Sequence, residues 1–113
     1  MAENKRNYKR FPTHLHATGQ LPDGGSFACQ IVDITPQGLA FLIDRDIEVN
    51  GQFELEIHID EKKRIVFRCQ TVRTEPATEE NLKKICTRII YGAAADQMRL
   101  YQFYSRLKKE RKL

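Results

Sequence analysis

The chain has 113 residues, of which 41% are apolar and 30% are charged, the proportions of an ordinary soluble globular protein. No apolar window is long enough for a membrane helix, and no apolar segment near Met1 resembles a secretory signal. A chain of this length can bury a core but not a large enclosed cavity beside it. We therefore expect a single domain in the cytoplasm.

The net charge of +4 is unevenly distributed along the chain. Residues 1–10 carry +3 and residues 106–113 carry +4, which leaves −3 for the segment between them. A general nucleic-acid binder more often has a basic stripe across its folded face, and no aromatic-rich basic strand is present for base stacking. RNA or DNA binding through the two basic ends is therefore the least favoured function.

The first part of the chain predicts a basic arm followed by three strands. Residues 1–12 are polar and basic and end at Pro12, which predicts a flexible N-terminal arm. Residues 14–21 alternate weakly, a clear turn follows at 22–25, and residues 27–33 alternate as a second strand. After a turn at 36–38, the apolar run 39–43 predicts a central strand covered on both sides.

The second part predicts three more strands and one helix. Residues 53–60 alternate with a period of two, and residues 64–74 form their hairpin partner. Residues 84–91 are the last strand candidate, and residues from about 94 to 110 are helical. The predicted fold is therefore all-β dominated, an antiparallel split barrel of about six strands with a C-terminal α-helix, spanning residues 13–113.

Apolar side chains along the helix are expected to face the barrel. We assign this stripe to Met98, Tyr101, Tyr104 and Leu107, flanked by Leu100 and Phe103. Because a helix packed on a barrel has a free side, Tyr101 or Phe103 could instead face a partner.

Two short motifs carry the candidate binding chemistry. Arg6 and Arg10 lie four residues apart in the basic arm, and Asp33, Thr35 and Gly38 are spaced as Asp-x-Thr-x-x-Gly at the end of a predicted strand. A guanidinium can pair with phosphate oxygens or with the O6/N7 edge of guanine. The second motif offers a carboxylate acceptor, a hydroxyl and a close backbone approach. Together they predict a site for a ligand with phosphates and guanine-like edges.

Each motif also has a purely structural interpretation. The two arginines could belong to a solvated basic tail. Asp33 and Thr35 could serve the turn itself, and Gly38 could be required by a positive φ there. The agreement of two independent motifs favours ligand binding.

The sequence gives no indication of an enzyme or of a metal site. No nucleophile stands beside an organising base, and no phosphate loop of the Walker kind is present. His14 and His16 have no third ligand at a suitable spacing. Cys29, Cys69 and Cys86 are too widely spaced for a zinc site or a disulfide framework. We expect no catalytic residues, no metal and no cofactor.

In this order and at this separation, the two motifs resemble those of the PilZ domain family of bacterial cyclic di-GMP receptors. Arg6 and Arg10 match the family's R-x-x-x-R, and Asp33, Thr35 and Gly38 match its [D/N]-x-S-x-x-G, with Thr in place of Ser. The resemblance implies that the arginines clasp the phosphates and guanine edges of cyclic di-GMP. Lys5 occupies a place that helps decide between one bound ligand and a stacked pair, and a basic residue favours the pair.

The resemblance implies a receptor or adaptor whose N-terminal arm becomes ordered on binding cyclic di-GMP, which changes its interaction with an unidentified downstream protein. The alternative is a PilZ-like adaptor that does not bind nucleotide, as in type IV pilus or motility systems. Two departures from the family keep this alternative open. They are Thr35 in place of Ser, and a last strand over residues 84–92 without the glycine that often opens it.

Overall fold

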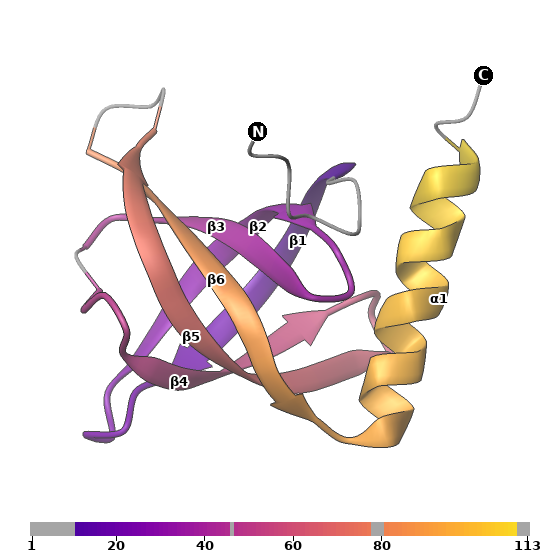
Figure 1. Ribbon diagram of the computed structural model, residues 1–113, viewed down its shortest axis with the longest axis horizontal. Coiled ribbons are helices and arrows are strands. Elements are labelled where there is room, and N and C mark those ends of the chain that lie inside the picture. The colour runs from indigo at the N-terminus through magenta and orange to yellow at the C-terminus, as the bar shows by residue number, and fades with distance from the viewer. Residues whose placement is uncertain (1–10, 46, 78–80, 111–113) are drawn as a thin grey trace, which may run out of the picture.

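The computed structural model describes residues 11–45, 47–77 and 81–110. These form six antiparallel strands and one helix (Figure 1): β1 (Phe11–Gln20), β2 (Ser26–Ile34), β3 (Gly38–Ile43), β4 (Gln52–His58), β5 (Arg64–Pro76), β6 (Lys83–Gly92) and α1 (Ala94–Glu110). The strands close into a barrel in the order β1-β2-β3-β6-β5-β4. The predicted fold class, a six-stranded antiparallel barrel with a C-terminal helix, is confirmed.

The barrel interior is filled by the alternating apolar positions of its strands. Phe27, Phe41 and Phe53, from β2, β3 and β4, pack against one another with ring centroids 5.7–5.9 Å apart. Strand β3 lies between β2 and β6, and its residues Leu39, Ala40 and Phe41 are all fully buried. This agrees with the expectation that the run 39–43 is covered on both sides.

Helix α1 stands beside the barrel (Figure 1), where it packs against β5 and β1. Its buried residues are Leu100, Tyr104 and Leu107, whereas Met98 and Tyr101 are exposed. The predicted stripe was therefore wrong at Met98 and Tyr101. Successive steps of three residues rotate backwards by about 60° each, so Met98 and Leu107 lie on opposite sides of a helix. Steps of four and then three keep Leu100, Tyr104 and Leu107 on one face.

The N-terminal arm predicted over residues 1–12 overlaps the first strand. Phe11 pairs with Ile34 and Pro12 pairs with Asp33, so β1 already includes the last two residues of that segment. A register shift between Pro12 and Leu15 accommodates the irregular start of this strand. Residues 1–10, including Lys5, Arg6 and Arg10, lie outside the described residues.

Candidate ligand-binding site

The turn between β2 and β3 is built around the hydroxyl of Thr35. Thr35 Oγ1 accepts N–H bonds from Gln37 at 3.1 Å and from Gly38 at 3.0 Å, and it donates to the Gly38 carbonyl oxygen at 3.1 Å. The side chain is buried. A hydroxyl has one donor and two acceptor positions, so these bonds use all of them. The observed role of Thr35 is to fix the turn, and its direct bond to a ligand oxygen stays a prediction.

Gly38 is required by the close approach of β6. It pairs with Arg88, and a Cβ at this position would lie 2.5 Å from the Thr87 carbonyl oxygen. Among the described glycines, only Gly24 has a positive φ. The interpretation of Gly38 as a left-handed turn residue is therefore wrong. Its missing side chain lets β3 and β6 pair directly beneath the Thr35 turn.

Asp33 lies in a row of paired residues that crosses four strands. It pairs with Ala40 of β3, Ala40 pairs with Cys86 of β6, and Cys86 pairs with Arg73 of β5. Their sequence neighbours Ile34, Leu39, Phe41 and Ile85 belong to the core, so the side chains of the row point away from the barrel interior, although Ala40 and Cys86 are themselves buried. The small residues Ala40 and Cys86 lie at the centre of the row, and the charged residues Asp33 and Arg73 lie at its two ends.

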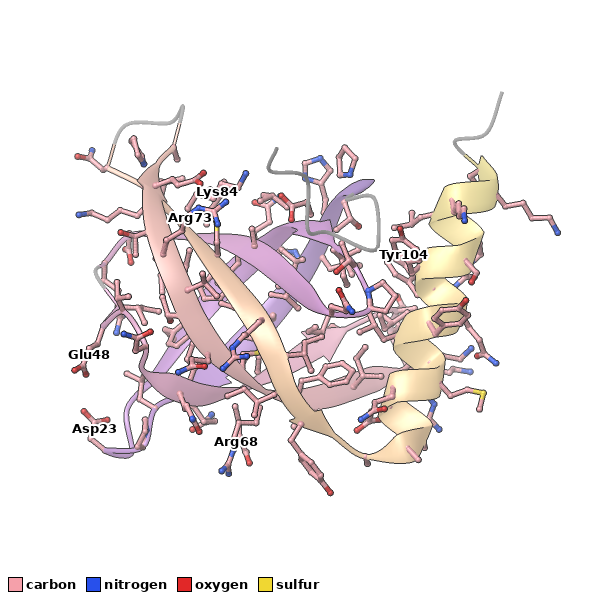
Figure 2. The ribbon with its side chains drawn as sticks, viewed as in Figure 1. Asp23, Glu48, Arg68, Arg73, Lys84 and Tyr104 are labelled. Atoms are coloured by element: carbon pink, nitrogen blue, oxygen red, sulfur yellow. The ribbon has the colours of Figure 1, made fainter. Side chains whose placement is uncertain are left out.

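Two cations from later strands accompany the Asp33 carboxylate. Lys84 Nζ lies 3.5 Å from Asp33 Oδ2, and the Asp33 side chain is 15% exposed. The pKa of the Arg73 guanidinium is raised, chiefly by its hydrogen bond to Glu75 and further by the charges of groups that include Asp33. Figure 2 shows Lys84 and Arg73 on the neighbouring strands β6 and β5. The Asp33 carboxylate thus lies beside positive charge from two later strands.

Arg88 occupies the next outward position on β6. It pairs with both Gly38 and Gln70, and its guanidinium donates two N–H bonds to Gln70 Oε1, at 2.9 and 2.7 Å. We call the outer surface that carries Asp33, Arg73, Lys84 and Arg88 the polar face. Its three cations were not predicted from the sequence. The alternation Lys84, Cys86, Arg88 along the last predicted strand could have placed two of them on one side.

The described chain begins beside the second motif. Because Phe11 and Pro12 pair with Ile34 and Asp33, β1 starts beside the aspartate. Arg6 and Arg10 immediately precede this strand in sequence and lie outside the described residues. The structure brings Asp33, Thr35 and Gly38 together and directs the chain that follows the arginines to the same end of β2.

Other classes of site have little support within the described ranges. No group of three His, Cys, Asp or Glu side chains in them could hold a metal ion. His14 instead shares a hydrogen bond with Gln30 across β1 and β2. The described helix is too short and too polar to span a membrane.

Residues 4–104 match the model of the PilZ domain family, and the chain therefore belongs to this family. PilZ domains are regulatory and receptor domains rather than enzymes. A search of curated proteins found no match.

Solved PilZ structures share the fold at low sequence identity. The inhibitor of motility from Bacillus subtilis (MotI/DgrA) is 18% identical, with a TM-score of 0.82 over 97% of this chain and 54% of that one. The MrkH–c-di-GMP complex from K. pneumonia is 17% identical, with a TM-score of 0.81 over 98% and 56%. The PilZ domain of YcgR from Escherichia coli with c-di-GMP is 13% identical, with a TM-score of 0.76 over 95% and 94%. The chain thus spans about half of the first two proteins.

Proposed function

We propose that this protein is a cytoplasmic receptor for cyclic di-GMP that regulates a downstream protein. One observation carries the proposal: Pro12 pairs with Asp33, so the Arg6–Arg10 motif leads directly into the strand beside the second motif. Two of the PilZ structures that share this fold are described as complexes with the same dinucleotide. The polar face adds Lys84 and Arg73 beside Asp33, which suits a dianionic ligand.

In the proposed complex, Arg6 and Arg10 clasp the phosphates and guanine edges, with Lys5 as a further cation. Asp33 accepts N–H bonds from a guanine through its carboxylate oxygens, with Lys84 beside them. Thr35 and Gly38 hold the turn on which the nucleotide lies. Each residue of the site thus contributes either charge, a hydrogen-bond acceptor or a fixed backbone.

The regulatory step is the ordering of the N-terminal arm by the ligand. Ordering about six residues costs several kcal/mol, at roughly 1–2 kcal/mol per residue. Charge-assisted hydrogen bonds contribute about 1.5–3 kcal/mol each, so four or more of them offset this cost. The ordered arm then presents an altered surface to the downstream protein, and the size of the change is limited by the ligand's differential affinity for the two states.

Calorimetric titration with cyclic di-GMP tests the proposal. We expect micromolar or tighter binding to the wild type and a loss of about 100-fold or more in the Arg6→Ala/Arg10→Ala variant, since two charge-assisted contacts disappear. A matched control, Arg45→Ala/Arg64→Ala, removes the same charge from exposed positions outside both motifs. Absence of binding heat, or equal affinities of the wild type and the arm variant, would refute the receptor function.

The second candidate is an adaptor that works without nucleotide. It is favoured by contacts that form without any ligand. Thr35 Oγ1 uses all of its hydrogen-bonding positions within the turn, and Lys84 pairs with Asp33. A stable complex with a protein partner that forms without cyclic di-GMP, and whose affinity the nucleotide does not change, would establish this candidate instead.

A further inference from the structure

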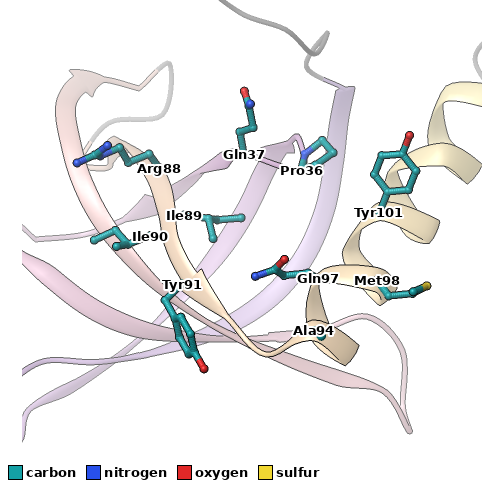
Figure 3. A pocket seen from close by; sticks show the side chains of 10 residues that line it. All are labelled: Pro36, Gln37, Arg88, Ile89, Ile90, Tyr91, Ala94, Gln97, Met98 and Tyr101. Carbon is teal, nitrogen blue, oxygen red and sulfur yellow. The ribbon is translucent and has the colours of Figure 1, made fainter.

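A cleft of about 790 Å³ lies between strand β6 and helix α1 (Figure 3). The turn residues Pro36 and Gln37 border it on the side of the proposed nucleotide site, and Met98 and Tyr101 border it on the helix. The Ile89 amide on its floor donates to the Gln37 carbonyl oxygen at 2.8 Å. The cleft and the Thr35 turn are therefore connected through the backbone.

The walls of this cleft carry a concentration of exposed apolar side chains. Ile90, Tyr91, Met98 and Tyr101 are 41%, 67%, 61% and 53% exposed, respectively. They are four of the seven large apolar side chains that are exposed among the described residues. Helix α1 packs on the barrel through a different face, so folding does not require Met98 and Tyr101. A clustered apolar surface of this kind marks an interaction site.

The charge of the cleft indicates the chemistry of its occupant. Arg88 is the one charged side chain among the described residues that line it. Its guanidinium bonds to the neutral Gln70 amide oxygen, and the ion pairs recorded between described residues do not include it. In Figure 3, Arg88 lies at the β6 edge of the cleft, and its side chain extends away from Met98 and Tyr101 on α1. The cleft thus offers apolar contacts on both walls and, at its β6 edge, a positive charge with no ion-pair partner among the described residues.

We infer that the cleft between β6 and α1 binds a short segment of a partner protein that presents large apolar side chains beside an acidic residue. Tyrosine, methionine and arginine are the side chains enriched at protein interfaces, and arginine pairs well with carboxylates. The inference deepens the proposed receptor function, on which it rests, because it names the surface and partner chemistry for the downstream protein.

Selection from a display library of random short peptides, followed by anisotropy titration of the enriched peptides, tests the inference. We expect enriched peptides to combine aromatic or aliphatic residues with Asp or Glu. Their affinity should fall at least tenfold, about 1.4 kcal/mol, in Met98→Ala/Tyr101→Ala. Val49→Ala is the matched control, because Val49 is 46% exposed but lies outside the cleft. Arg88→Glu should reverse the preference, favouring analogues whose acidic residue is replaced by Lys.

Three outcomes would overturn the inference. The library could yield no specific peptide, or its peptides could bind Met98→Ala/Tyr101→Ala and Arg88→Glu like the wild type. Sedimentation could show a self-associated wild type that Met98→Ala/Tyr101→Ala makes monomeric, which would assign the cleft to a second copy. Calorimetry on the wild type and on Met98→Ala/Tyr101→Ala, which leaves the polar face unchanged, keeps the two proposals distinct. Failure to obtain a specific peptide for the wild type, with intact cyclic di-GMP binding, refutes only the inference. Specific peptide binding by a wild type that gives no heat with cyclic di-GMP refutes only the receptor function.

Discussion

Thr35 and Gly38 are bonded to each other through both backbone and side chain. The Thr35 amide donates to the Gly38 carbonyl oxygen at 2.8 Å, while Thr35 Oγ1 accepts the Gly38 amide at 3.0 Å. Two residues of one short motif therefore define the turn before any ligand arrives. Their roles differ and can be measured independently. The Thr35 hydroxyl closes the turn, and the absence of a side chain at Gly38 allows β6 to pair closely with β3.

Removing the Thr35 hydroxyl should destabilise the fold. Thr35→Val leaves the Gln37 and Gly38 amides without their acceptor, and we expect a loss of about 1–3 kcal/mol in the free energy of unfolding. Thr35→Ser keeps the acceptor and loses one methyl group, so it should cost less than about 1 kcal/mol. Urea unfolding of the two variants measures the difference, and equal stability of Thr35→Val and the wild type would show that the hydroxyl is dispensable.

Adding a methyl group at Gly38 should separate β3 from β6. The new Cβ would meet the Thr87 carbonyl oxygen at 2.5 Å, and we expect Gly38→Ala to cost about 1–3 kcal/mol of stability. Gly25→Ala is the control, because its Cβ would meet only side-chain ends, Asp23 Oδ1 at 3.2 Å and Leu21 Cδ1 at 3.6 Å. Thermal unfolding should show a lower Tm for Gly38→Ala alone. A similar Tm for both variants would mean that the strands can shift at little cost.

Lys84 should contribute to nucleotide affinity more than to stability. The Lys84–Asp33 pair is partly exposed, so Lys84→Met should change the free energy of unfolding by about 1 kcal/mol or less. Loss of one positive charge near a dianion should weaken cyclic di-GMP binding by about two- to fivefold, and the effect should shrink at high salt. Calorimetry at two ionic strengths measures this, with the hairpin variant Lys62→Met as control. Tighter binding by Lys84→Met would instead show that Lys84 blocks Asp33.

The buried thiols should make the fold sensitive to alkaline pH. Burial raises the pKa of Cys29 and of Cys69 from 9.0 to about 12. Between these values the unfolded chain loses thiol protons that the native chain keeps, so stability falls as pH rises from about 9 towards 12. The slope reaches about 1.4 kcal/mol per pH unit for each thiol. Chemical unfolding across this range should give a shallower slope for Cys29→Ala and for Cys69→Ala, and unchanged slopes would contradict the prediction.

Lys5 should set the number of nucleotides bound. The resemblance to the family implies that a basic residue immediately before the arginine motif favours a stacked pair, so we expect the wild type to bind two molecules of cyclic di-GMP per chain. Lys5→Leu removes the cation beside the phosphates and should bind one. The calorimetric stoichiometry distinguishes the two, and an identical stoichiometry for both proteins would show that Lys5 has no such role.

The strands were predictable because their side chains alternate, and the closure of the barrel was not. Phe53, Leu55 and Ile57 show the period of two in the sequence, and all three are buried in β4. The pairing of β4 with β1, which closes the sheet, joins segments about 40 residues apart, such as Gly19 and Leu55, and no local pattern encodes it. The face of α1 was missed because several spacings in an apolar-rich helix look plausible until its packing partner is known.

Residue spacing in the sequence predicted part of the candidate site, and the rest is brought together by the pairing of distant strands. Asp33, Thr35 and Gly38 were found from their spacing within one turn. Lys84 and Arg73 reach Asp33 only because β6 and β5 follow β3 around the barrel. Without the order of the strands in the barrel, the sequence does not show that these cations lie beside the motif.

Amide NMR spectra recorded during titration with cyclic di-GMP test the central claim most directly. We expect the perturbations to concentrate at residues 33–38 and 84–88, where the polar face meets the Thr35 turn, together with the amides of the arginine motif. Shifts confined to the far hairpin at residues 59–63, with residues 33–38 unchanged at saturating nucleotide, would contradict the account.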